Sequence, residues 1–540
     1  MRIGVDLDNT LIYYDRLFKK LAVSSGLVTQ NWTGDKAKIR KHIRELSNGE
    51  HRWQQLQGCV YGEAIEDADA FSGAIRFLWR AKHKGHKVFI VSHKTKFAHH
   101  DSSVNLREQA LKWLANNKIY GASTCNLVDD VFFLPTKEKK IEKFNDLKLD
   151  VIIDDLVEII EHPFLDKHIN AILFSSNDIE KNNLNRFSSW SGIDNYLLGD
   201  YEKSDCELFI KDSGIGTVNS CCSYNKGGNS SVWKVEVNNK YVFSLKYYNN
   251  DLMHADRRKT EIKSIKFMRQ FGLDNIPDFV MTDKYLETSL FSHINADPVQ
   301  TLTKDRVDVV VNFLKKLKCM GRNQEFSLAS AACLSGVDIV DQIDLRISQI
   351  QTACILNAEL DTFIQQSFLP LFERLKVWSK KHWPGNDDFN NVIDIERQTL
   401  TPSDMGVHNM LEDCDGNIFF IDFEYFGFDD PVKTTSDFLF QPQNKIDVEL
   451  GKYWVASMNK IFSGGDNAFM ERLMASWPLY GLCWCLIMLN KYHEINRQQR
   501  MQSKGHAQSE YSTIKLEKLK KAEKLLDFIK LNYQEFPYSK

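Results

Sequence analysis

At 540 residues the chain is too long for one ordinary hydrophobic core, and at about 150 residues per domain it predicts roughly two to four domains. Hydrophobic residues make up 43% and charged residues 26%, which excludes disordered and fibrous proteins. The net charge of −3 provides no basic field to attract nucleic acid or anionic lipid.

The start of the chain shows no pattern typical of export. Its first apolar run is broken by Asp6 and Asp8, unlike the core of a signal peptide. The most apolar later segment, around residues 479–489, is too short to span a bilayer. The eleven cysteines lack paired metal-ligand spacing and favour reduced thiols. We therefore expect a cytoplasmic protein with no membrane partner.

Residues 1–195 predict an α/β domain. Strands that are apolar on both faces alternate with helical segments, as in a parallel sheet covered on both sides. The predicted strands are Ile3–Val5, Lys87–Val91, Val131–Phe133, Val151–Ile153 and Ile169–Phe174. A charged stretch with helical spacing lies between the first two strands, at about residues 11–80, and we expect it to form a small helical cap.

An acidic pair follows the first predicted strand. Alternation along the chain points Asp6 and Asp8 to the same side, where like charges repel unless a cation lies between them. Mg²⁺ is the natural cation for such oxygen ligands. The purely structural alternative is a capped strand-to-helix turn that uses Asp8 and Thr10.

Three further elements follow in order. They are Ser92 at the end of an apolar strand, a lysine (Lys137 or Lys140) at a helix start, and the strand-terminal pair Asp154–Asp155. Together with the Asp6-x-Asp8-x-Thr10 motif, they make residues 1–195 resemble the haloacid dehalogenase-like phosphatase superfamily. All four motifs of that superfamily occur here in the family's order.

The resemblance implies a Rossmann-like domain that hydrolyses phosphomonoesters. By it, Asp6 is the nucleophile that forms an aspartyl-phosphate, and Asp8 is the acid and base for the leaving oxygen and for water. Thr10 completes this catalytic motif. Asp6, the Asp8 backbone carbonyl and Asp154 would hold Mg²⁺, with Asp155 as the second choice.

The resemblance further assigns the phosphoryl oxygens to Ser92 and a lysine. We prefer Lys137 to Lys140 because it lies nearer the helix start, but the spacing leaves both open.

Residues 175–201 form a polar segment rich in Ser and Asn, a composition that predicts a domain boundary. We place a linker at residues 196–212 and a second domain at 213–540. Its N-lobe is expected at about 213–295 and its C-lobe at about 296–540.

The N-lobe pattern predicts a hairpin and a helix. Val232–Val237 and Tyr241–Tyr247 alternate as strands around a turn at Asn238–Asn239, and a helix follows at about Asp256–Phe271. A kinase needs a glycine-containing loop over the phosphates, a strand lysine and a carboxylate that orients it. The candidates are Gly227, Gly228 and Ser230 in the loop, Lys246 on the strand and Glu261 on the helix. Taken alone, the glycines and the lysine are better explained by a plain hairpin.

The C-lobe carries the more specific motif. Asp404 and Asn409 have the Asp-x-x-x-x-Asn spacing of a kinase catalytic loop, and a strand that begins at Ile418 ends in Asp422. With the segment 423–431 and the later Ser436–Phe438, residues 205–540 resemble the aminoglycoside phosphotransferase and choline kinase-like family. The resemblance implies a bilobal, protein-kinase-like α+β fold.

By that resemblance Asp404 is the base, Asn409 and Asp422 bind Mg²⁺, and Lys246 paired with Glu261 holds the ATP phosphates. The chain departs from the family at Pro402, where a histidine is usual. His408 lies on the other side of Asp404, and we interpret it as a structural loop residue rather than a replacement.

The predicted function is therefore a bifunctional Mg²⁺-dependent enzyme, a phosphatase followed by an ATP-dependent kinase. Only a short stretch separates Asp422 from Pro431, and no Ala-Pro-Glu follows, so there is little room for a segment that docks a protein substrate. The expected partners are a small phosphate ester and a small hydroxyl acceptor of sugar or polyol type. The alternative is a regulatory module with degenerate sites, which Pro402 favours. The third interpretation is nucleic-acid end processing. Such a function needs a basic groove lined by aromatic residues, which the composition does not indicate.

Overall fold

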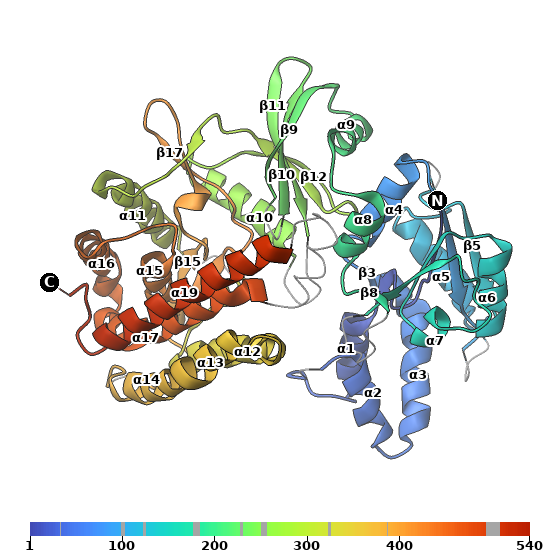
Figure 1. Cartoon of the computed structure of the whole chain (residues 1–540), viewed down its shortest axis with the longest axis horizontal. Helices are drawn as coiled ribbons and strands as arrows, with labels where there is room; N and C mark the ends of the chain where they lie inside the picture. Colours follow the sequence, from blue (N-terminus) through green and yellow to red (C-terminus); the bar gives the residue numbers. More distant parts are fainter. Residues whose placement is uncertain are drawn as a thin grey trace. The chain divides into compact units, whose positions relative to one another are not determined.

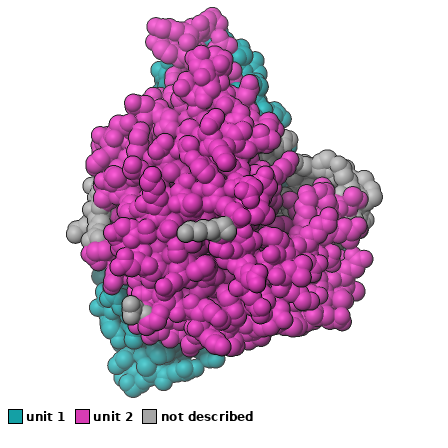
Figure 2. Space-filling view, turned by 90° about the vertical axis from the view of Figure 1, so that its left-hand side faces the viewer, with its two compact units in different colours: residues 1–232, 247–253, 282–288 teal, residues 233–246, 254–281, 289–540 magenta. Residues whose placement is uncertain are grey.

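The computed structural model describes residues 1–32, 34–98, 103–121, 126–175, 184–226, 230–249, 256–321, 326–385, 387–492 and 508–539. The chain forms two compact units, coloured teal and magenta in Figure 2. The first contains Met1–Val232 and the short segments Tyr247–Met253 and Thr282–Thr288, and the second contains the remainder.

The first unit is built on a six-stranded sheet in which every pairing is parallel. Its strands are β1 (Arg2–Val5), β4 (Lys87–His93), β5 (Asp130–Leu134), β6 (Val151–Asp154), β7 (Asn170–Phe174) and β8 (Asn185–Phe187), in the order β5-β4-β1-β6-β7-β8. Counted along the chain this order is 3-2-1-4-5-6, that of a doubly wound α/β sheet. The predicted parallel α/β sheet is confirmed. β8 was not predicted, because it lies in the polar segment that composition assigned to a boundary.

Helices accompany the sheet and form the insertion after β1. The insertion consists of α1 (Asp15–Ser24), α2 (Lys36–Arg44) and α3 (Gly49–Tyr61), next to a short hairpin of β2 (Ile12–Tyr13) and β3 (Asp69–Ala70). The remaining helices are α4 (Ala74–His83), α5 (Leu106–Asn116), α6 (Lys137–Asp146), α7 (Val157–Ile160), α8 (Trp190–Leu198) and α9 (Lys203–Asp212). α4 packs against β4 and α8 and so belongs to the sheet layer. The segment expected as a linker, 196–212, contains α9, whose start carries a capping box of Glu202 and Asp205.

A five-stranded sheet opens the region expected as the N-lobe. Its strands are β9 (Val218–Lys226), β10 (Ser230–Val237), β11 (Tyr241–Tyr248), β12 (Phe279–Asp283) and β13 (Thr288–Ser292), in the order β12-β13-β11-β10-β9. Asn238 and Asn239 join β10 to β11 with φ of 54° and 53°. A two-residue hairpin turn requires positive φ at both positions, and asparagine tolerates it well. The predicted hairpin is therefore present, and α10 (Arg257–Gln270) follows as expected.

After residue 300, the second unit is mainly helical. Its long helices are α11 (Lys304–Cys319), α12 (Gly336–Ile355), α14 (Leu369–Lys381), α15 (Pro431–Phe440), α16 (Val448–Phe462), α17 (Phe469–Met488) and α19 (Gln508–Asn532). α17 lies at the centre of the helical core, with α12, α14, α15 and α19 packed against it (Figure 1). Among the described residues, none of the helices combines the length and apolarity needed to cross a bilayer.

Candidate active sites

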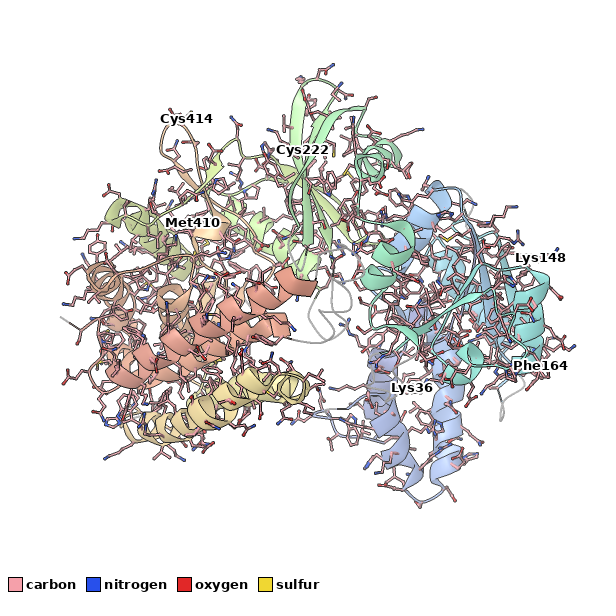
Figure 3. All side chains as sticks on the ribbon, viewed as in Figure 1. Lys36, Lys148, Phe164, Cys222, Met410 and Cys414 are labelled. Carbon is pink, nitrogen blue, oxygen red and sulfur yellow. The ribbon has the colours of Figure 1, made fainter. Side chains whose placement is uncertain are left out.

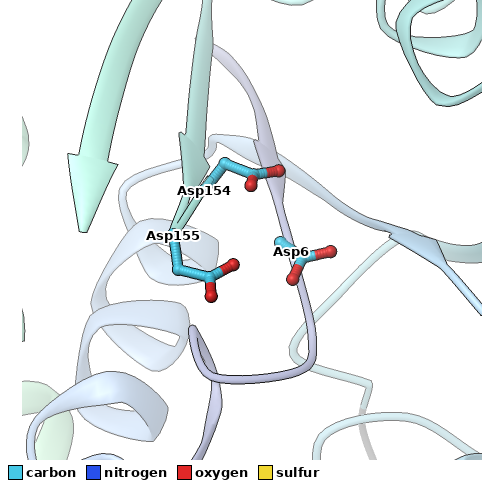
Figure 4. A group of neighbouring side chains, drawn as sticks. All are labelled: Asp6, Asp154 and Asp155. Atoms are coloured by element: carbon cyan, nitrogen blue, oxygen red, sulfur yellow. The ribbon is translucent and has the colours of Figure 1, made fainter. Parts of the chain in front are cut away.

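Three carboxylates meet at the carboxyl ends of β1 and β6. Val5 pairs with Ile153 in the parallel ladder, and the Asp6 N–H continues it by donating to the Ile153 carbonyl at 2.9 Å. Asp6 therefore lies beside Asp154, the last residue of β6, and Asp155 follows directly. One carboxylate oxygen from each of the three lies within 4.8 Å of the others. Figure 4 shows the three side chains as neighbours at the strand ends. The predicted Asp6 and Asp154 are thus brought together, and Asp155 joins them.

A buried lysine connects this cluster. Lys140 of α6 places its Nζ 2.5 Å from Asp6 Oδ1 and 2.6 Å from Asp154 Oδ2. Lys137 instead pairs with Glu158 at a solvent-exposed position. The preference for Lys137 is thus corrected by the geometry. Thr136 caps α6, so Lys137 is the first residue of the helix. Lys140 lies one turn later and is the lysine that reaches the strand ends.

The cluster carries more negative than positive charge. Burial raises the pKa of Asp6, Lys140 lowers it, and Asp154 raises it again, so that the net shift is upward. Burial, followed by the charges of Asp6 and Asp154, also raises the pKa of Asp155. Raised carboxyl pKa values mark a site where one lysine does not neutralise the acids, which is the environment that a hard divalent cation relieves. The residues present therefore fit Mg²⁺.

The two hydroxyl residues of the predicted phosphatase site are both buried. Ser92 is in β4, the strand next to β1, and is 1% exposed. Thr10 is fully buried; Trp190 Nε1 donates to its carbonyl at 2.8 Å, and its own hydroxyl has no hydrogen-bond partner among the described residues.

Asp8 lies in a separate ion pair. Lys94 Nζ approaches its two carboxylate oxygens at 2.9 and 2.7 Å, and the Tyr14 hydroxyl donates to Oδ1 at 2.6 Å. Burial raises the pKa of Asp8, but Lys94 and Tyr14 outweigh it and the pKa is lowered. Lys94 was not predicted from the sequence. Its position two residues after Ser92 was the available signal, because alternate residues of an extended chain share a side.

In the second unit, a buried lysine again joins acids that are distant in sequence. Lys246 of β11 places its Nζ 2.7 Å from Glu261 Oε2 on α10 and 2.6 Å from Asp422 Oδ1. Burial raises the pKa of Glu261, Lys246 lowers it, and Asp422 is the next contributor, with a net upward shift. The three predicted residues therefore form one cluster.

The fourth member of this cluster, Glu424, was not predicted from the sequence. This buried carboxylate lies 3.2 Å from Lys246 Nζ and groups with Glu261 and Asp422 as a possible cation site. The signal was again a spacing of two residues, here from Asp422.

Short strands position the catalytic-loop residues. β16 (Met410–Glu412) pairs with β17 (Ile418–Phe420), and the Ile421 N–H donates to the Asn409 carbonyl at 3.1 Å. Asn409 therefore lies next to the residue that precedes Asp422. Its side-chain amide donates to the Asp404 carbonyl at 3.1 Å, which ties the predicted base to the metal-ligand candidates.

Two residues of this region have a strained backbone. Ser403 and Asp422 adopt φ of 68° and 69°, a region that residues other than glycine seldom occupy. Such conformations persist only where the surrounding contacts hold them, and they concentrate at functional sites.

His408 contacts the predicted base directly. Its Nε2 lies 3.2 Å from Asp404 Oδ2. Burial lowers the pKa of His408, but the hydrogen bond and charge of Asp404 raise it, with a net upward shift. A Cβ on Gly406 would approach the His408 ring to 2.8 Å, so the glycine leaves room for this contact. The interpretation of His408 as a structural loop residue did not include this contact with Asp404, and its role stays a prediction.

The predicted phosphate loop is only partly described. Ser230 is the first residue of β10, whereas Gly227 and Gly228 lie outside the described residues. The role of this loop stays a prediction.

No family model matches the chain, and no curated protein matches it. Solved structures that are similar to part of the chain include the following three phosphotransferases. A spectinomycin phosphotransferase solved with ADP and spectinomycin is 11% identical, with a TM-score of 0.42 over 61% of this chain and 99% of that one. Choline kinase LicA from Streptococcus pneumoniae is 13% identical, with a TM-score of 0.38 over 60% and 99% of the two chains. The ethanolamine kinase from Plasmodium vivax is 12% identical, with a TM-score of 0.39 over 60% and 91%. Likenesses this distant transfer no activity, so the function has to follow from the residues of the two sites.

Proposed function

We propose that the chain is a bifunctional Mg²⁺-dependent enzyme, with a phosphomonoester phosphatase in the first unit and an ATP-dependent small-molecule kinase in the second. One observation common to both sites carries the proposal. In each, a buried lysine joins carboxylates from distant parts of the chain, Lys140 with Asp6 and Asp154, and Lys246 with Glu261 and Asp422. Burying charges in this way costs free energy, and such buried ionisable clusters occur preferentially at functional sites.

In the phosphatase, Asp6 attacks the phosphoryl group and forms an aspartyl-phosphate, which water then hydrolyses. Ser92 and Lys140 bind the phosphoryl oxygens, and Lys140 also neutralises the charge that develops on them. Asp8 donates a proton to the leaving oxygen and then accepts a proton from the water that hydrolyses the aspartyl-phosphate. Its partner Lys94 holds the Asp8 carboxylate in one orientation. The motif resemblance to haloacid dehalogenase-like phosphatases supports these roles.

The acid clusters supply the ligands for Mg²⁺. Asp6, Asp154 and the backbone carbonyl of Asp8 would hold it in the first unit, and Asn409 and Asp422 in the second. In both places a bound Mg²⁺ would neutralise phosphate charge and fix its orientation.

In the kinase, Asp404 accepts the proton of the substrate hydroxyl, and Lys246, oriented by Glu261, holds the ATP phosphates. Asn409 fixes the Asp404 backbone through its amide hydrogen bond. The resemblance to aminoglycoside phosphotransferases and choline kinases supports a small-molecule acceptor, and we propose one of sugar or polyol type.

The degenerate-site alternative rested on Pro402. The contact between His408 and Asp404 weakens it, because the base still has an imidazole partner. We therefore favour catalysis at both sites.

The test is a panel of small phosphate esters for phosphate release, and a panel of small alcohols with ATP for phosphorylation, on the full chain with Mg²⁺. We expect both activities, and both should disappear when the metal is chelated. Absence of one activity across its panel, with the other present, would reject that half of the proposal.

The choice between the two lysines gives a direct prediction. Lys140→Met should reduce phosphate release by about 10²-fold or more, because the phosphoryl charge loses its buried cation. Lys137→Met is the matched control, since it removes the same charge one helical turn away at an exposed position. It should stay within about twofold of wild type, and equal losses in both variants would contradict the assignment.

His408 is expected to act on turnover rather than on ATP binding. His408→Phe keeps a ring beside Gly406 but removes the hydrogen bond to Asp404, and should lower kcat about 10- to 100-fold with little change in the KM for ATP. His408→Gln, which retains a donor, should recover part of the loss. Steady-state kinetics separates these effects, and a rise in KM alone would assign His408 to nucleotide binding instead.

A further inference from the structure

A lysine from the insertion after β1 contacts the loop that carries Asp6 and Asp8. Lys36, the first residue of α2, is labelled in Figure 3. Its Nζ donates to the side-chain oxygen of Asn9 at 3.1 Å and to the Tyr61 hydroxyl at 2.7 Å. Because Asn9 directly follows Asp8, this lysine lies next to the candidate acid and base.

Lys36 has neutral hydrogen-bond partners only. Among the described residues no carboxylate forms an ion pair with it, and the nearby Asp8 is already paired with Lys94 at 2.7 Å. Burial lowers the pKa of Lys36, and the charges of Asp8, Asp155 and Asp15 only partly offset it. A partly buried ammonium group without a counter-ion is costly, and an anionic ligand would remove that cost.

Aromatic rings hold the lysine in place. Lys36 Nζ lies 5.2 Å from the ring centre of Phe18 and 5.4 Å from that of Tyr61, and Lys94 Nζ lies 5.3 Å from the same Tyr61 ring. Tyr61 thus contacts both ammonium groups. An ammonium group has three donors, and Asn9 and Tyr61 use two of those on Lys36. The third donor of the Lys36 ammonium group is left for a ligand.

We propose that Lys36 and the Tyr61 hydroxyl form a subsite for a second anionic group on the alcohol part of the substrate. This inference rests on the proposed phosphatase function, in which Ser92 and Lys140 hold the transferred phosphoryl group and Asp8 contacts the leaving oxygen. A group next to Asp8 and Asn9 therefore belongs to the leaving alcohol. The substrate class is a phosphomonoester whose alcohol carries a carboxylate or another phosphate.

Two matched pairs of compounds test the subsite and separate its two anion sources. 3-Phosphoglycerate differs from glycerol 3-phosphate by a carboxylate, and fructose 1,6-bisphosphate differs from fructose 6-phosphate by a phosphate. In at least one pair, kcat/KM of the full chain should favour the more anionic member at least about tenfold. Lys36→Met should reduce that ratio at least about tenfold, and Lys36→Arg should keep most of it.

Lys41→Met is the control, because it removes the same charge from an exposed position of the same helix and should leave the ratio as in wild type. Calorimetry on the Asp6→Asn variant with Mg²⁺ gives a readout without turnover, and the same preference should appear in the Kd values. Ratios near one in both pairs, or a preference that survives Lys36→Met, would overturn the subsite. Absence of phosphate release from all four compounds would instead count against the phosphatase, and the calorimetric preference would then decide the subsite by itself.

Discussion

Asp6→Asn should abolish Mg²⁺-dependent phosphate release, with a loss of at least about 10³-fold, while ATP-dependent phosphorylation stays within about twofold of wild type. The amide is nearly the same size as the carboxylate but does not attack phosphorus, and it is a poor Mg²⁺ ligand. Asp6 is also the carboxylate that both Lys140 and the end of β1 hold in place. Phosphate release and product formation by the kinase are measured on the same full-length preparation.

The melting temperature of Asp6→Asn shows whether its loss of activity comes from the chemistry or from unfolding. Burial and Asp154 raise the pKa of Asp6 in spite of Lys140, so the ionised carboxylate is disfavoured in the folded chain. For an acid with a raised pKa, protonation stabilises the fold at low pH, and this stabilisation is lost as the pH rises through the folded-state pKa. At neutral pH, without metal, Asp6→Asn should therefore melt no lower than wild type.

Asp146→Asn removes a carboxylate from an exposed position on α6 and serves as the control for net charge. It should keep both activities. Phosphate release at the wild-type rate in Asp6→Asn would reject Asp6 as the nucleophile.

The second large effect is expected at Asp404. Asp404→Ala should reduce phosphoryl transfer about 10²- to 10⁴-fold and leave the Kd for Mg-ATP nearly unchanged, because the base contacts the acceptor hydroxyl and not the nucleotide. Single-turnover kinetics gives the transfer rate, and calorimetry gives the Kd.

A substitution at Asp422 should instead weaken the binding of Mg-ATP. Asp422→Asn is the better substitution, since asparagine tolerates the φ of 69° that alanine would occupy only under strain. Loss of the carboxylate removes a proposed Mg²⁺ ligand and a partner of Lys246, so the affinity for Mg-ATP should fall at least about tenfold. Asp415→Asn, at the exposed turn between β16 and β17, is the matched control. If both Asp404→Ala and Asp422→Asn bound Mg-ATP like wild type, the metal role of Asp422 would be wrong.

The sequence by itself determined those parts of the fold that depend on local periodicity. The buried strands of the first unit are continuous apolar runs, so their positions and the parallel sheet were predictable. The Asn238–Asn239 turn was predictable for a similar reason, because few residues tolerate its backbone conformation. β8 was missed, since its Asn185–Phe187 segment has neither signal.

Site residues that lie close together along the chain were likewise visible. Asp6 and Asp8 share one strand end, and Asp404 and Asn409 share one loop, so spacing alone brings each pair into the same region. Motif order then indicated which distant residues accompany them.

Only the tertiary structure decided how helices and loops meet these strand ends. Lys137 and Lys140 lie on nearly the same face of α6 and differ by about 4.5 Å along its axis, so the packing of α6 against the sheet determines which of them reaches Asp6. The contacts of Lys36 and His408 were missed for the same reason. Each residue acts through a contact whose distance depends on how a loop or insertion packs, and neither composition nor spacing along the chain specifies that distance.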